Sequence, residues 1–153
     1  MKHIVRIPFF AVVSLMFASC ANLPEGAVSP QNLSEGVAIK GYDPVAYFHQ
    51  GKPVEGSPEI DATWEGAVYH FATEENREVF INSPEKYVPQ YGGYCAYAIA
   101  VDQIADIDPD YWAIVDERLY LNANGFAQTL WDLDRPANIE SGNANWNDRF
   151  SSN

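Results

Sequence analysis

The chain has 153 residues, of which 47% are hydrophobic and 20% charged, a size that suits one domain with an appendage. Nine Lys and Arg against 21 Asp and Glu give a net charge of -12, which argues against binding to the phosphate backbone of nucleic acid. Aromatic residues make up 14% of the chain, far more than a disordered acidic chain carries. We therefore expect a folded domain with an acidic surface.

The N-terminus has the pattern of a secretory signal peptide. Residues 1–6 are short and basic, and residues 7–18 form an apolar run that ends on small residues. As a helix this run would span about 18 Å, against roughly 30 Å for the core of a bilayer, which argues against a membrane-spanning helix. The ending Phe-Ala-Ser-Cys resembles a bacterial lipobox, so we predict that residues 1–19 are removed and that Cys20 is lipidated, with an ordinary signal peptide as the alternative.

Removal of residues 1–19 changes the chemistry of the remaining chain. The mature part keeps seven basic and 21 acidic residues, a net charge of -14. Its cysteines are Cys20 and Cys95, and acylation of Cys20 leaves Cys95 without an intrachain disulfide partner. Ala21 follows Cys20 in place of Asp, which favours the outer over the inner membrane.

The first half of the mature chain is predicted to be a tether followed by short strands. Residues 20–36 comprise the lipidated cysteine and a flexible tether rich in Pro, Gly, Ser and Asn, and the folded domain covers residues 37–150. Residues 37–42 and 45–48 have the composition of strands on either side of an Asp-Pro turn. Residues 62–71 are predicted to form a hairpin around a Glu-Gly turn.

The second half is predicted to be largely helical. Thr73 caps a helix over residues 74–82, and Pro84 occupies the first position of another short helix. Residues 94–101 are apolar all round and predict a buried helix. The remaining elements are a hairpin over residues 112–115 and 119–122 and helices over residues 126–133 and 139–150.

The order of these segments resembles that of the longer bacterial YHS-domain proteins. The motifs that carry the resemblance are GYDPVAYF at residues 41–48, WEG at 64–66, SPEKYVPQYGGYCA at 83–96 and LYLN at 119–122. The resemblance covers residues 37–150 and implies an α+β fold, a small domain with short antiparallel β-hairpins packed against several short helices. Shorter YHS modules, attached to metal-transport ATPases and oxygenases, are thought to bind metals through paired cysteines. The matching block here keeps only Cys95, with His70 in the Tyr-His pair.

Cys95, His70 and His49 are the candidate metal ligands. A thiolate and imidazoles suit copper or zinc, although a closed tetrahedral site would need a further ligand. Two alternatives stay open for Cys95, because a free cysteine is often a small buried hydrophobe and an activated one can do redox or covalent chemistry. His70 lies between two aromatic residues of a predicted strand and is expected to face away from the core if they are buried.

A tyrosine-rich block next to Cys95 is the candidate wall of a ligand pocket. Its members are Tyr91, Gly92, Gly93, Tyr94 and Tyr97. The glycines would let a ligand approach the backbone closely, and the tyrosine hydroxyls could orient it. The sequence contains no recognisable Ser-His-Asp set and no Gly-rich phosphate loop, so an enzyme is the less favoured class.

The sequence therefore predicts a noncatalytic envelope lipoprotein, exported and held through Cys20 on the periplasmic face of the outer membrane. Its domain is expected to bind a copper or zinc ion or a small ligand near Cys95. The alternative is an interaction or scaffold module that contacts another envelope protein or a second copy of itself, with Cys95 a buried structural thiol.

Overall fold

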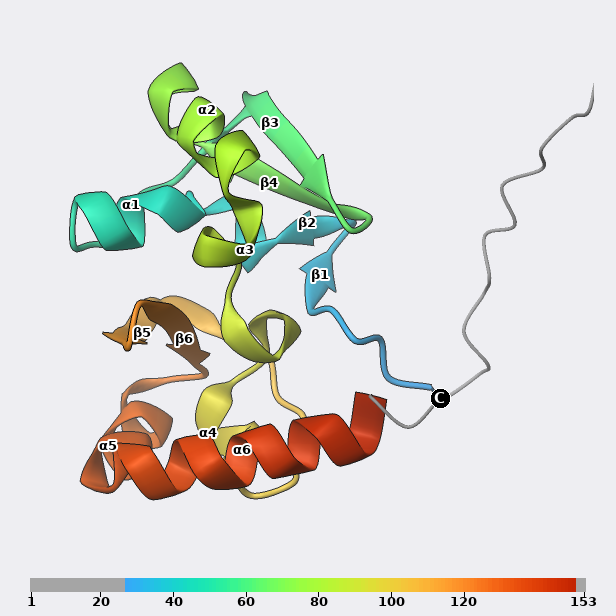
Figure 1. Ribbon diagram of the computed structural model, residues 1–153, viewed down its shortest axis with the longest axis vertical. Helices are drawn as coiled ribbons and strands as arrows, with labels where there is room; N and C mark the ends of the chain where they lie inside the picture. The colour runs from blue at the N-terminus through green and yellow to red at the C-terminus, as the bar shows by residue number, and fades with distance from the viewer. Residues whose placement is uncertain (1–26, 151–153) are drawn as a thin grey trace, which may run out of the picture.

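The computed structural model describes residues 27–150, which fold into two halves stacked along the long axis of the molecule (Figure 1). The upper half holds a four-stranded sheet and three short helices, and the lower half holds a two-stranded hairpin and three further helices. The strands are short and mostly antiparallel, and helices pack against both sheets. This arrangement confirms the predicted α+β class.

The four-stranded sheet has the order β1-β2-β4-β3. Its strands are β1 (Leu33–Ser34), β2 (Val37–Ala38), β3 (Ser57–Trp64) and β4 (Ala67–Phe71). The hairpin of β3 and β4 turns at Glu65 and Gly66, as predicted. Tyr69 and Phe71 of β4 point into the core, whereas His70 between them is half-buried on the other face.

Residues 45–48 form a helix, and the strand predicted there is wrong. Helix α1 (Pro44–His49) begins after Asp43, whose Oδ1 accepts hydrogen bonds from the backbone N–H groups of Val45 (2.8 Å) and Ala46 (3.3 Å). Pro44 occupies the first helical position. This N-cap outweighs the strand preference of the β-branched and aromatic residues that follow. The strand predicted over residues 37–42 is also shorter, because β2 leads into the 3-10 turn η1 (Ile39–Gly41).

The carboxylate of Asp43 is completely buried and joins three elements. Its Oδ2 accepts hydrogen bonds from the backbone N–H of Ala72 (2.8 Å), at the end of β4, and from Nδ2 of Asn76 (2.7 Å). Asn76 belongs to α2 (Glu74–Asn82). All four bonds to Asp43 come from N–H donors, which is what a deprotonated carboxylate requires when it is removed from water.

The segment after β4 follows its helix signals closely. Thr73 caps α2 through a 3.1 Å hydrogen bond from the backbone N–H of Asn76 to its Oγ1, and α3 (Pro84–Tyr87) begins at Pro84. The chain then passes through the 3-10 turn η2 (Gln90–Gly93) into the buried helix α4 (Ala96–Ala100). These elements confirm the three helices predicted between residues 74 and 101.

The lower half is completed by a hairpin and two helices. Strands β5 (Asp108–Val115) and β6 (Arg118–Asn122) pair antiparallel, and α5 (Gly125–Leu133) and α6 (Arg135–Phe150) follow. The predicted elements are present, but β5 and α6 each begin four residues earlier than expected. Nδ2 of Asn145 in α6 donates to the backbone oxygens of Ile99 (2.9 Å) and Ala100 (3.2 Å), which caps the last carbonyls of α4.

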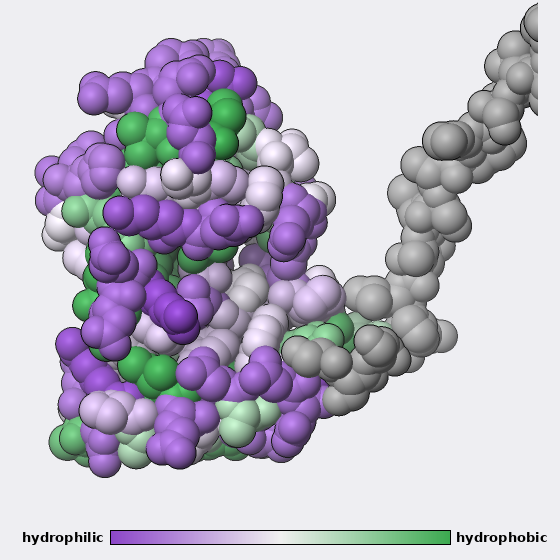
Figure 2. Space-filling model, viewed as in Figure 1, coloured by the Kyte–Doolittle hydropathy of each residue, from purple (hydrophilic) through white to green (hydrophobic). Residues whose placement is uncertain are grey.

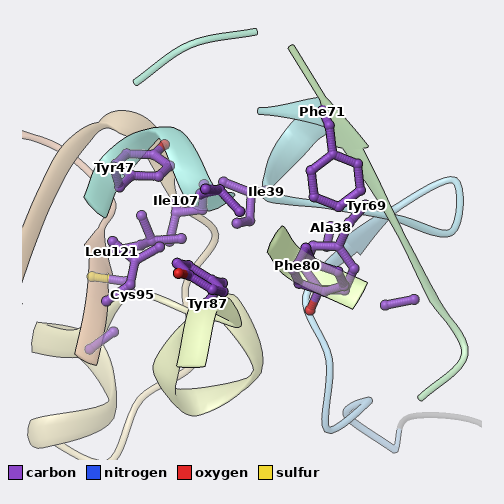
Figure 3. Packing of buried hydrophobic residues seen from close by; sticks show 14 of the residues in the cluster. Ala38, Ile39, Tyr47, Tyr69, Phe71, Phe80, Tyr87, Cys95, Ile107 and Leu121 are labelled. Carbon is purple, nitrogen blue, oxygen red and sulfur yellow. The ribbon is translucent and has the colours of Figure 1, made fainter. Parts of the chain in front are cut away.

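One hydrophobic cluster runs through both halves (Figure 3), and a second, around Tyr91, Tyr120 and Trp131, lies beside it. Tyr69, Phe71 and Phe80 contribute from the upper half, and Cys95 and Leu121 contribute from the lower half. The halves are also joined by α1, since the Tyr47 hydroxyl donates a 3.0 Å hydrogen bond to the backbone oxygen of Pro109. The described residues therefore form a single folding unit rather than two separable ones.

The segment before β1 is packed on the domain, where the sequence predicted a flexible tether. Residues 29–32, called the strap below, run along η2. The backbone N–H of Asn32 donates to the oxygen of Gly92 (2.9 Å), Nδ2 of Asn32 donates to the oxygen of Gly93 (3.1 Å), and the Tyr94 hydroxyl donates to the oxygen of Ser29 (3.1 Å). The folded part of the chain thus begins upstream of residue 37.

The predictions for the N-terminal signal and for lipidation of Cys20 lie outside the described residues. Within residues 27–150, no helix has both the length and the apolar character needed to cross a membrane.

The buried carboxylate of Asp43 yields a direct test. Asp43→Asn places an amide N–H₂ group against N–H donors, and we expect the free energy of unfolding to fall by about 2–4 kcal/mol in urea denaturation. Asp61→Asn is the matched control, because Asp61 is an exposed residue of β3, and it should change the value by less than about 0.5 kcal/mol. Equal effects of the two substitutions would contradict the central role of Asp43.

Candidate functional site

A cleft of about 520 Å³ opens between the two halves, on the side of the strap. Figure 2 shows this face hollowed between the halves, with pale side chains of intermediate hydropathy gathered there. The cleft is lined by Pro30, Gln31, Leu33, Trp64, Glu65, Tyr69, Val88, Pro89, Gln90, Tyr91, Gly92, Trp146 and Phe150. Its volume lies within the range of small-molecule sites in proteins.

Tyr69 provides a polar group on the wall of the cleft. Its side chain is only 5% exposed, and its ring packs on Phe80 with centroids 4.9 Å apart. The hydroxyl makes no hydrogen bond with any residue from 27 to 150. Burial, helped by the nearby Glu65 carboxylate, raises the pKa of Tyr69 to about 12. The group is thus a protonated hydroxyl at neutral pH, free to bond to a ligand.

Tyr91 lies on the opposite side and is fully engaged with the protein. Its hydroxyl donates towards the backbone oxygen of Ile139 (3.3 Å) and Oδ1 of Asn143 (3.1 Å), both in α6. Burial raises the pKa of Tyr91 well above its usual value. A Cβ at Gly142 would lie 2.7 Å from the Tyr91 hydroxyl oxygen, so the glycine lets α6 approach this ring.

Aromatic rings from different elements form the walls. Trp64 ends β3, whereas Trp146 and Phe150 belong to the last two turns of α6. The Trp146 ring lies 5.9 Å from that of Tyr91 and 4.3 Å from that of Phe150, measured between centroids. Trp64, Trp146 and Phe150 are all half-buried, so each retains surface that a ligand can cover.

The strap closes one side of the cleft and depends on Gly92. The φ angle of Gly92 is +58°, and a Cβ there would lie 2.0 Å from the backbone oxygen of Pro30. The contact is with backbone, which cannot swing away as a side chain can. Only glycine at this position permits the strap to lie where it does.

Two of the five predicted pocket residues line the cleft. Tyr91 and Gly92 do so, but the other three have different contacts. The Gly93 oxygen and the Tyr94 hydroxyl bind the strap from below, and the backbone N–H of Tyr97 donates to Oδ1 of Asn122 (3.1 Å). The structure therefore places Tyr91 and Gly92 at the cleft and Gly93, Tyr94 and Tyr97 away from its lining.

Cys95 is buried in the core and lies within a hydrogen-bond network. The side chain is 1% exposed. Its sulfur donates to Oδ1 of Asn122 (3.6 Å) and accepts from the backbone N–H of Ala123 (3.3 Å). Asn122, itself completely buried, donates through Nδ2 to Oε1 of Gln128 (3.0 Å). The thiol thus both donates and accepts a hydrogen bond within the protein. This favours a structural thiol over a metal ligand or a reactive thiol.

The two candidate histidine ligands contact other groups. Nε2 of the exposed His49 lies 3.2 Å from the Tyr87 hydroxyl. His70 is covered by the turn around Gly41, where a Cβ would lie 3.2 Å from its Nδ1. Among the residues that the structure describes, no group of three or more His, Cys, Asp or Glu side chains is placed to hold a metal ion. The structure does not bring Cys95, His70 and His49 into one such cluster.

Sequence reasoning missed Trp64, Tyr69, Trp146 and Phe150 as cleft residues. Tyr69 carried a partial signal, because a tyrosine on the buried face of a strand needs a partner for its hydroxyl. Trp146 and Phe150 are four residues apart on a helix, which predicts a shared face but not what that face meets.

Comparison with protein-family models, with curated proteins and with solved structures gave no match for this chain.

Gly92→Ala should detach the strap. We expect a fall of about 1–3 kcal/mol in the free energy of unfolding and faster proteolytic cleavage near residue 30, because the added methyl group meets backbone. Gly51→Ala is the control, since its φ is +65° but a Cβ there would meet nothing within 4 Å. If both variants lose the same stability and neither is cut faster, the strap contact does not form in solution.

Native Cys95 should resist thiol reagents. In a Cys20→Ser chain, in which Cys95 is the one remaining cysteine, we expect maleimide labelling only at the rate at which the domain opens. A second chain that also carries Ser141→Cys provides an exposed thiol on α6 that should react at once. Equally fast labelling of Cys95 without denaturant would show that the thiol is accessible.

Proposed function

We propose that this chain is a noncatalytic lipoprotein of the bacterial cell envelope whose YHS-like domain binds a small organic ligand in the aromatic cleft. In this proposal Cys20 carries the lipid anchor on the periplasmic face of the outer membrane. The motif order from residue 41 to residue 122 supports the YHS-like assignment, and the α+β fold is of the kind that it implies.

The unbonded hydroxyl of Tyr69 is the observation that carries the binding proposal. The Tyr69 residue is only 5% exposed, yet its hydroxyl oxygen keeps accessible surface on the wall of the cleft and has no hydrogen-bond partner among residues 27–150. The Tyr91 hydroxyl, in the same cleft, has two. A ligand that supplied the missing partner would gain a hydrogen bond to Tyr69, and the half-buried tryptophans that line the cleft would supply apolar contact.

The residues predicted to bind copper or zinc already have other contacts within the protein. The cleft is therefore a better candidate for ligand binding than a metal site at these residues. A metal at Cys95 would have to displace the hydrogen bonds of its sulfur with Asn122 and Ala123 and open the core around it. His49 and His70 would have to leave their contacts with Tyr87 and Gly41. We therefore place the ligand at the cleft rather than at Cys95.

The second candidate function is an interaction module that contacts another envelope protein or a second copy of this chain. It is favoured by the outer face of α5, where Phe126 is 75% exposed and Leu133 is 76% exposed. These residues are seven apart, so they lie on the same face of the helix. Exposed apolar faces of this kind are typical of protein contact sites.

Two tyrosine variants test the proposed binding site. A library of small organic compounds is screened by ligand-observed NMR, and the affinity of each hit is measured for Tyr69→Phe and Tyr91→Phe proteins. Tyr69→Phe removes a hydroxyl with no protein partner, so we expect unchanged stability and an affinity about 2- to 12-fold weaker. Tyr91→Phe breaks bonds to α6 and should lower the free energy of unfolding by about 0.5–1.5 kcal/mol.

If no compound binds, the cleft proposal is wrong and the interaction module becomes the better-supported function. It is equally wrong if the compounds that bind retain full affinity for the Tyr69→Phe protein and for a Trp146→Ala protein, because such ligands bind elsewhere.

A further inference from the structure

The charge of the cleft limits what can bind there. Of the described residues that line it, none is Lys, Arg or His, and one is an acid, Glu65. The carboxylate of Glu65 forms no ion pair with any residue from 27 to 150. An anionic ligand would therefore enter the cleft against a negative charge and without a counter-charge, in a protein whose net charge is already -12.

The backbone of Glu65 is held by the turn in which it lies. Glu65 sits in the β3–β4 turn with φ of +47°, a conformation that the tight hairpin imposes. Its backbone oxygen accepts a 3.2 Å hydrogen bond from Nε2 of Gln31 in the strap. The β3–β4 turn and the strap therefore place the backbone of Glu65 beside the cleft, and its exposed carboxylate can reach the cleft mouth.

The aromatic lining has the electrostatic character that suits a cation. The faces of Trp and Tyr rings carry partial negative charge and attract ammonium groups, most strongly where water is excluded. Trp64 and Trp146 approach the cleft from the upper and lower halves, and Tyr69 and Tyr91 complete the lining. The electroneutral side chains at the rim, Gln31 and Gln90, add hydrogen-bonding groups without adding charge.

We propose that the ligand of this cleft is an organic cation with an alkylated ammonium group, which lies against the tryptophan faces with Glu65 as its counter-charge. This inference rests on the proposed function and names the ligand class of the same site. The Tyr69 hydroxyl would bond to an oxygen of the ligand, because the ammonium head itself, once fully alkylated, has no hydrogen bond to offer or accept. Small size and positive charge are then both required for binding.

Three probes of nearly equal shape test the ligand class. Choline carries the quaternary ammonium group and a hydroxyl, 3,3-dimethylbutan-1-ol replaces the nitrogen with carbon, and 3,3-dimethylbutanoate carries a negative charge. Calorimetric titration of the full chain should show choline bound at least about tenfold more tightly than the neutral alcohol, and no binding of the carboxylate.

Two acid-to-amide variants show whether the charge of the cleft is responsible. Glu65→Gln should weaken choline binding about three- to tenfold and leave binding of the neutral alcohol unchanged. Glu59→Gln is the matched control, an exposed acid on β3 that does not line the cleft, and it should alter neither affinity.

Equal binding of choline and the neutral alcohol would overturn the cation inference, as would equal effects of the Glu65 and Glu59 variants. Binding of other library compounds, sensitive to Tyr69→Phe, with no binding of choline would overturn it too. In each of these cases the proposed function stands. Absence of any ligand whose affinity depends on Tyr69 or Trp146 would overturn the cation inference and the proposed function together.

Discussion

The upper half of the domain depends on one buried carboxylate. Asp43 has no exposed surface, and removal of a charge from water is costly unless hydrogen bonds replace the lost solvation. Four N–H donors from α1, the end of β4 and α2 supply those bonds. Asp43 therefore starts α1 and fixes the end of β4, the strand that carries Tyr69. Loss of this interaction would disturb the upper wall of the cleft without touching a residue that lines it.

The cleft is assembled from segments that meet only in the folded chain. The strap, the β3–β4 turn, η2 and α6 each supply lining residues, and glycines allow the closest approaches between them. The absence of a Cβ at Gly92 leaves room for the strap, and its absence at Gly142 lets the Tyr91 hydroxyl pack against α6.

Local signals in the sequence predicted much of the fold, and tertiary contacts decided the rest. Thr73 and Pro84 marked helix starts correctly, because caps act within one turn. The strand prediction for residues 45–48 is wrong because the β-branched and aromatic composition was weighted above the local cap of Asp43 and Pro44, whereas the bonds of Asp43 to Ala72 and Asn76 arise only on folding. Tyr91 and Gly92 were predicted as pocket residues from the Gly-Gly turn. Trp64 and Trp146 were missed because their shared cleft exists only through packing of the two halves.

The four tryptophans allow the most direct test of the claim that the aromatic cleft binds an organic cation. Trp64 and Trp146 line the cleft, whereas Trp112 packs on Tyr47 and Trp131 is completely buried. In a ¹⁵N-labelled chain the four indole N–H signals can be followed by NMR as choline is added. We expect saturable shifts of the Trp64 and Trp146 signals, with those of Trp112 and Trp131 unchanged. Four unmoved signals, or shifts confined to Trp112 and Trp131, would contradict it.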